Sequence, residues 1–66
     1  MKVTLNKSEI NIFKGAKISD LVLAYSERSY KMLITGKLSV YDRFGNLTEN
    51  DGPVYEGQVF ILKRAE

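Results

Sequence analysis

The sequence predicts a single α+β domain in which a mixed sheet of four to five strands packs one face against one helix. Three observations lead to this prediction. Apolar residues alternate with polar ones near the N-terminus, residues 18–25 have a helical period, and turn signals containing glycine separate the later segments. A chain of 66 residues is long enough for one core only, so residues 1–66 are predicted to form one domain.

The first two predicted strands form a β-hairpin. Val3 and Leu5 alternate with polar residues, and Ile10 and Ile12 do the same after a polar break. Two short alternating runs around such a break are typical of a hairpin with one buried face. Phe13 interrupts the alternation, so we expect it to mark the end of the second strand or to cap the core.

A helix is predicted from about Ser19 to Ser26. The apolar residues at positions 18, 21, 22 and 25 follow the i, i+3, i+4, i+7 spacing of one helical face. We expect Ser19 to be the N-cap and Asp20 to interact favourably with the helix dipole. Residues 27–29 are predicted to be a loop.

The remaining strands are predicted in the second half of the chain. Residues 30–34 and 38–41 are rich in apolar residues and predict two further strands, and residues 47–48 predict a brief returning strand. The last run, 58–63, is mostly apolar and is expected to be a central strand with both faces buried. The predicted turns are Thr35-Gly36-Lys37, Arg43-Phe44-Gly45-Asn46, Asn50-Asp51-Gly52-Pro53 and Glu56-Gly57.

A hairpin, a helix and further strands with the last strand in the centre form the β-grasp arrangement. In this arrangement the first and last strands pair in parallel and the helix covers one face of the sheet. A small SH3-like or OB-like barrel is the alternative, and the helical period of residues 18–25 counts against it.

The composition excludes several kinds of chemistry. The chain contains no Cys and no His, so disulfides, thiolate nucleophiles, Cys-ligated metal centres and Ser–His–Asp triads are impossible. The eight carboxylates are expected to be turn and surface acids, and the oxygen-rich stretch 42–51 lacks the spacing of a calcium-binding EF-hand loop. We therefore predict that the protein is not an enzyme and has no catalytic, metal-binding or cofactor-binding residues.

Charge and hydropathy indicate the environment of the protein. The net charge is +2 and the basic residues are scattered, which disfavours nucleic acid as a partner because phosphate binding usually leaves a basic stripe. No apolar run approaches the roughly 20 residues that span a bilayer, and the N-terminus does not resemble a signal peptide. A cytoplasmic location without membrane contact is expected.

Four segments, taken in order, show a family resemblance: Val3-Thr4-Leu5-Asn6, Gly15-Ala16-Lys17-Ile18-Ser19-Asp20-Leu21, Ile34-Thr35-Gly36-Lys37 and Glu56-Gly57-Gln58-Val59. They resemble the ubiquitin-like sulfur carriers of thiamine and molybdopterin biosynthesis and the related TGS domains, over nearly the whole chain. Those carriers end in Gly-Gly, whose carboxylate is adenylated and then becomes a thiocarboxylate. This chain ends in Lys63-Arg64-Ala65-Glu66 instead. The resemblance thus implies a ubiquitin-like fold without the carrier's active tail.

We predict a non-catalytic protein-interaction module, and the resemblance implies an adenylating or sulfur-transfer enzyme as a partner. More apolar residues are present than one helix can cover, and an open sheet face or edge can bind a protein. Two alternatives are a sulfur carrier whose Gly-Gly tail is absent or truncated, and an RNA-associated TGS-like module that uses Lys63 and Arg64. The residues predicted to contact the protein partner are Tyr30, Met32, Leu38, Val40, Tyr41, Lys63 and Arg64.

Overall fold

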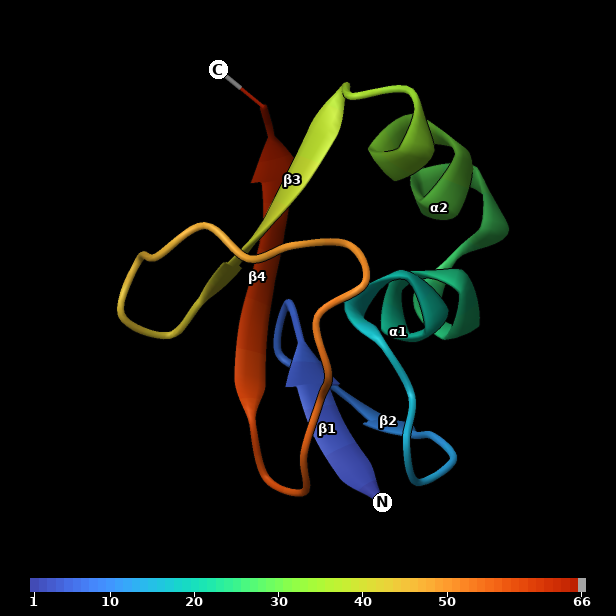
Figure 1. Cartoon of the computed structure of the whole chain (residues 1–66), viewed down its shortest axis with the longest axis vertical. Coiled ribbons are helices and arrows are strands. Elements are labelled where there is room, and N and C mark those ends of the chain that lie inside the picture. Colours follow the sequence, from blue (N-terminus) through green and yellow to red (C-terminus); the bar gives the residue numbers. More distant parts are fainter. Residues whose placement is uncertain (66) are drawn as a thin grey trace.

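The computed structural model describes residues 1–65, which form a four-stranded sheet with two helices on one of its faces (Figure 1). The sheet order is β2-β1-β4-β3; β1 and β4 pair in parallel and the other neighbours pair antiparallel. The α+β class, the mixed sheet and the central position of the last strand are therefore confirmed. Glu66 lies outside the described residues. The elements are β1 (Lys2–Leu5), β2 (Ser8–Asn11), α1 (Ile18–Tyr25), α2 (Glu27–Ile34), β3 (Leu38–Asp42) and β4 (Val59–Arg64).

The β1–β2 hairpin turns on two residues, Asn6 and Lys7, which both have positive φ angles of 49° and 68°. Positive φ at both central residues is the signature of a type I′ turn, whose twist matches that of the flanking strands. The Asn6 N–H donates to the carbonyl oxygen of Phe60 at 3.1 Å. The Asn6 side chain also pairs with the backbone of Leu62: Nδ2 donates to its oxygen at 3.2 Å, and Oδ1 accepts from its N–H at 2.9 Å. The hairpin turn is thus bonded directly to β4.

Helix α1 begins one residue earlier than predicted, because a distant loop satisfies its first amides. The Ile18 N–H donates to the Gly52 carbonyl at 2.9 Å, and the Ser19 N–H donates to the Asn50 carbonyl at 2.8 Å. The Asp20 carboxylate accepts from the Lys17 N–H at 2.9 Å. The prediction that Ser19 is the N-cap is wrong, because Lys17 occupies that position. Asp20 lies in the first turn, as predicted.

A second helix, α2, replaces the predicted loop at 27–29 and the predicted strand at 30–34. Ser26 is its N-cap, and the Ser26 Oγ accepts from the Ser29 N–H at 3.2 Å. Glu27 and Lys31 form an i, i+4 pair with 3.8 Å between Oε1 and Nζ. The strand prediction is wrong because the apolar run contributes to the core with a helical spacing: Leu33 is buried, and Tyr30, three residues earlier, packs against the core.

The structure also differs from three smaller predictions. Leu47 forms only an isolated bridge with Tyr41, so the described residues contain no fifth strand. Phe13 is exposed and lies two residues beyond the end of β2, so the prediction that it could cap the core is wrong. Strand β4 is buried on one face only, because Ile61 is 42% exposed between two buried neighbours.

The core lies between the inner face of the sheet and the helices. Helix α1 contacts β1 and β2, and α2 contacts β3. The buried apolar residues are Val3, Leu5, Ile12, Ala16, Ile18, Leu21, Val22, Leu33, Val40, Val54, Phe60 and Leu62. Within residues 1–65 no polar or charged residue is buried, so apolar packing alone fills the core. In the same part of the chain, neither helix has the length and apolar character to cross a membrane.

Candidate functional site

The sheet face that is turned away from the helices is defined here as the open face. In β4, Phe60 and Leu62 are buried in the core. Since successive side chains of a strand point to opposite faces, Val59, Ile61 and Lys63 lie on the open face. Both helices lie on the other side of the sheet (Figure 1), so they do not cover these side chains.

Neighbouring segments extend this apolar group across the sheet. Tyr41 of β3 pairs in register with Ile61, and Leu47 lies opposite Tyr41 through the isolated bridge. On the other side, Thr4 of β1 pairs in register with Val59. We call the row Leu47, Tyr41, Ile61 and Val59 the apolar stripe. Leu47 is 66% exposed and Ile61 is 42% exposed, so the stripe presents hydrocarbon to solvent on a face that no helix covers.

A cation–π contact fixes the position of one charge beside the stripe. The Lys63 ammonium lies 4.5 Å from the centroid of the Tyr41 ring. Contacts of this kind contribute about 0.5–1 kcal/mol at exposed sites. The contact brings together two residues that are 22 positions apart in the chain, and the β3–β4 register makes it possible.

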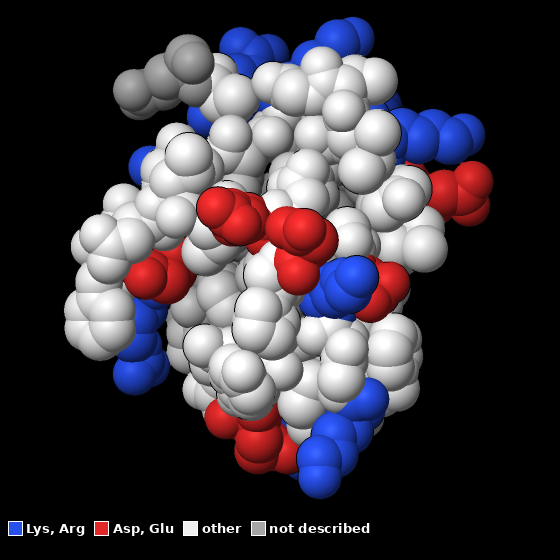
Figure 2. All heavy atoms as spheres, viewed as in Figure 1, with Lys and Arg blue, Asp and Glu red and all other residues white. Residues whose placement is uncertain are grey.

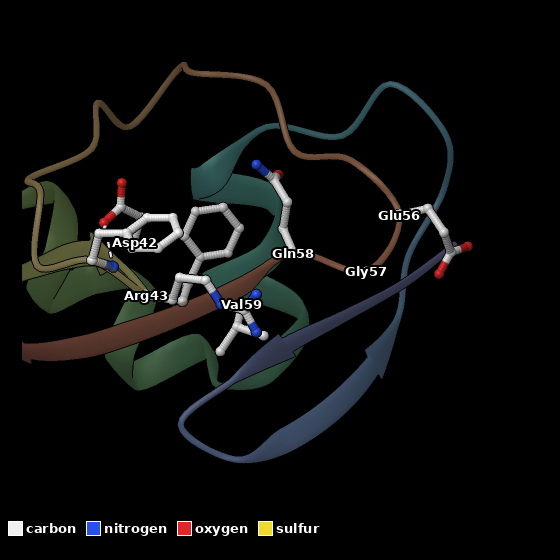
Figure 3. Close-up of a pocket in the computed structure, with 8 residues that line it drawn as sticks. Asp42, Arg43, Glu56, Gly57, Gln58 and Val59 are labelled. Carbon is white, nitrogen blue, oxygen red and sulfur yellow. Dashed lines mark hydrogen bonds between the residues drawn. The ribbon is translucent and has the colours of Figure 1, made fainter.

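Two further cations border the stripe. Lys7, in the hairpin turn, lines a shallow hollow together with Val59 and Ile61. Arg43 lines a second hollow together with Val59 (Figure 3). In the described part of the chain, Lys7, Arg43 and Lys63 form no ion pair with a carboxylate. The apolar stripe is therefore bordered by positive charge.

The hollow in Figure 3 lies between the turn that follows β3 and the start of β4, and has a volume of about 270 Å³. Two carboxylates line it, and the structure separates them. Glu56 points away from the hollow, and its Oε2 accepts from the Lys2 N–H at 3.1 Å. Asp42 is bonded to the turn beside it. A hydrolytic pair needs two carboxyl groups facing one substrate, and among the described residues this hollow does not provide them.

Asp42 organises the turn that the sequence predicts at residues 43–46. Its Oδ1 accepts from the N–H groups of Phe44 at 2.8 Å and Asn46 at 2.9 Å, and its Oδ2 accepts from Asn46 Nδ2 at 3.2 Å. The backbone hydrogen bond from Asn46 is the largest cause that lowers the pKa of Asp42 below its ordinary value of 3.8. Because these bonds favour the charged carboxylate, they stabilise the fold more when Asp42 is ionised than when it is protonated.

We expect the contribution of Asp42 to stability to depend on pH. Since the pKa is lower in the folded chain than in the unfolded chain, this contribution is fully present above 3.8 and is lost as the pH falls through the lower folded pKa. The difference in urea midpoint between the wild type and Asp42→Asn should therefore shrink on acidification below 3.8. Asp51→Asn is the matched control, because it makes the same chemical change in another exposed turn, where the described structure shows no hydrogen bond to the side chain. A difference for Asp42→Asn that stays constant with pH would contradict the assignment.

The residues predicted to bind a partner are distributed over three regions. Tyr41 and Lys63 lie together on the open face. Val40 is buried in the core, and Leu38 and Tyr30 are partly buried and pack against it. Burial leaves Val40 unavailable to a partner, and the placement of Tyr30 on a sheet surface is wrong because it lies on α2.

The other two predicted residues are separate from the stripe. Met32 lies on α2, in the helical layer. Arg64 is exposed at the end of β4 and pairs in register with Leu38, which places it on the opposite face from Lys63. Sequence reasoning missed Val59 and Ile61. Alternation within residues 59–63 is the signal that could have identified them, had the last strand been expected to bury one face only.

Charged side chains are spread out over the face of the molecule that Figure 2 shows. In Figure 2 the Lys and Arg side chains of the visible face are separated by uncharged surface and do not form one basic stripe. Comparison of the chain with protein-family profiles, curated proteins and solved structures gives no significant match. The functional interpretation consequently depends on the open face and its chemistry.

Proposed function

We propose that this chain is a ubiquitin-like β-grasp module that binds a protein partner through the open face. The topology supports the β-grasp assignment, because the N-terminal hairpin is followed by helices on one face and β4 pairs in parallel with β1 at the centre of the sheet. Helix α2 is an addition to the one-helix plan that the sequence predicts. The resemblance to the sulfur carriers adds an adenylating or sulfur-transfer enzyme as the partner to test first.

The observation that carries this proposal is the uncovered apolar stripe. The helices cover the inner face of the sheet, whereas Ile61 and Leu47 remain 42% and 66% exposed, so much of their hydrocarbon is in water in the free chain. Hydrocarbon of this kind becomes useful when a partner covers it, since binding then removes it from water. The module is proposed to be non-catalytic because Asp42 and Glu56, the carboxylates of the hollow near the stripe, are both bonded to backbone amides.

An NMR titration tests the proposal. The ¹⁵N-labelled protein is titrated with a purified adenylating enzyme, and we expect the shifted resonances to cluster at Tyr41, Val59, Ile61 and Lys63. Ile61→Gln should weaken binding about tenfold or more, because it places an amide at the centre of the apolar contact. Leu23→Gln is the matched control: Leu23 is 47% exposed on α1, a comparable aliphatic position in the helical layer.

Two results would contradict the proposal. Shifts confined to α1 and α2 would assign binding to the helical layer. Equal effects of Ile61→Gln and Leu23→Gln would show that the apolar stripe is not the contact surface. Circular dichroism of both variants separates a loss of binding from a loss of folding.

A further inference from the structure

We propose that the segment bound by the open face is acidic as well as apolar: a short protein segment whose aliphatic side chains cover the stripe and whose Asp or Glu residues reach Lys7, Arg43 and Lys63. This inference rests on the proposed function, because it specifies what the open face binds. It is independent of which protein contains the segment.

The charges around the stripe support an acidic partner. Lys63 is held over the Tyr41 ring, and Lys7 and Arg43 line the two hollows on either side of Val59. These cations approach the stripe from the β3–β4 pair, the hairpin turn and the turn after β3, so a bound segment meets positive charge on several sides. Charge complementarity of this kind steers association and selects the partner.

Among the described residues, the carboxylates near the open face form no ion pair with these cations. Glu9 lies on the open face because it pairs in register with Thr4, and its Oε1 is 3.7 Å from the Lys2 ammonium. Asp42 accepts hydrogen bonds from the turn after β3, and Glu56 accepts from the Lys2 N–H. None of these three acids forms an ion pair with Lys7, Arg43 or Lys63 in the described part of the chain, so the three cations remain available to acidic side chains of a partner.

The size of the open face favours a short segment over a second folded copy. With strands about 4.8 Å apart and a rise of about 3.3 Å per residue, four strands of four to six residues present a plan area of roughly 300 Å². A stable interface between folded proteins uses about 20–30 residues on each partner, whereas only about half of the residues in these four strands face outward. An extended segment of about six residues, or a helix of about ten residues, fits this area.

The chemistry of the stripe favours a protein segment over RNA. Single-stranded RNA binds by stacking bases on aromatic rings, and the aromatic ring of the stripe, Tyr41, already has an ammonium over one face. The other members, Leu47, Val59 and Ile61, are aliphatic. A nucleic acid would thus find phosphate contacts and one largely exposed ring, Phe44 in the turn after β3, whereas a segment with aliphatic and acidic side chains would use the cations and the whole stripe.

Selection from a phage-displayed library of random 12-residue peptides tests the inference on the full chain. We expect the recovered peptides to combine aliphatic residues with Asp or Glu. A synthetic copy of the best peptide should bind at least about tenfold more weakly to the double variant Lys63→Glu, Arg43→Glu, and its affinity should fall as salt is added. The control is Lys14→Glu, Arg28→Glu, which makes the same charge change at exposed positions away from the stripe.

The outcomes distinguish this inference from the proposed function. Peptides that lose affinity with Ile61→Gln but respond equally to the two charge variants would overturn the acidic partner and leave the open face as the binding site. Peptides that ignore Ile61→Gln, or a library that yields none, would overturn both. A 12-nucleotide oligouridylate that binds more tightly than every recovered peptide would replace the protein segment with RNA.

Discussion

Replacing Leu21 by Ala will lower the free energy of unfolding by about 3–4 kcal/mol, whereas Leu23→Ala will cost less than about 1 kcal/mol. Both residues lie on α1, yet Leu21 is fully buried and Leu23 is 47% exposed. The first substitution removes three carbon atoms from the closed core and leaves a cavity beside the sheet. The second removes them from a side chain that is largely in water, and Ala has the higher helix propensity.

The consequence of Leu21→Ala is large because the domain is small. A core of this size, without disulfides, supplies a net stability of only about 3–5 kcal/mol, so the variant should be mostly unfolded even without denaturant. Urea titrations followed by circular dichroism measure both variants, with a stabilising osmolyte added to bring Leu21→Ala into the measurable range. Similar losses for the two substitutions would mean that α1 does not pack against the sheet as described.

The spacing of apolar residues correctly predicted the elements that bury one face and whose apolar residues recur at regular intervals. The alternation of Val3 and Leu5 predicted β1, and the helical spacing from Ile18 to Tyr25 predicted α1. Helix α2 was missed because its run of apolar residues is equally typical of a strand, and eight residues are too few for the helical period to stand out. The local signal that could have identified it is Ser26 at the N-cap, followed by Glu27 in the first turn.

The candidate site was only partly predictable, because strand register is a non-local property. Tyr41 and Lys63 were expected to contact a partner, but nothing local indicates that Tyr41 lies opposite Ile61. Lys7 and Arg43 lie beside the stripe because of the conformations of the two turns that contain them. The positive φ angles of the hairpin turn and the hydrogen bonds that Asp42 accepts from the turn after β3 determine these conformations. The charge border of the stripe therefore emerges only from the folded arrangement.

Asn6→Ala is expected to lower the free energy of unfolding by about 2–4 kcal/mol, although Asn6 is an exposed turn residue. β4 pairs with β1 only as far as Leu5 and Phe60, since the chain turns away at Asn6. The Asn6 amide then takes the place of the next backbone unit and bonds both the N–H and the carbonyl of Leu62. Alanine removes these two bonds, each contributing about 1 kcal/mol, and also strains the backbone at φ 49° by about 1–2 kcal/mol.

Glycine at the same position separates these two causes. Asn6→Gly tolerates positive φ but lacks the amide, so its loss should be about 1 kcal/mol smaller than that of Asn6→Ala. Lys7→Gly is the control: its φ of 68° is also positive, no side-chain hydrogen bond of Lys7 is present in the described structure, and glycine there should stabilise the turn. Equal losses for Asn6→Gly and Asn6→Ala would assign the whole effect to the bonds with Leu62. A negligible loss for Asn6→Gly would instead mean that the side-chain amide does not extend the β1–β4 pairing. The hairpin turn that positions Lys7 beside the apolar stripe would then be held by backbone pairing alone.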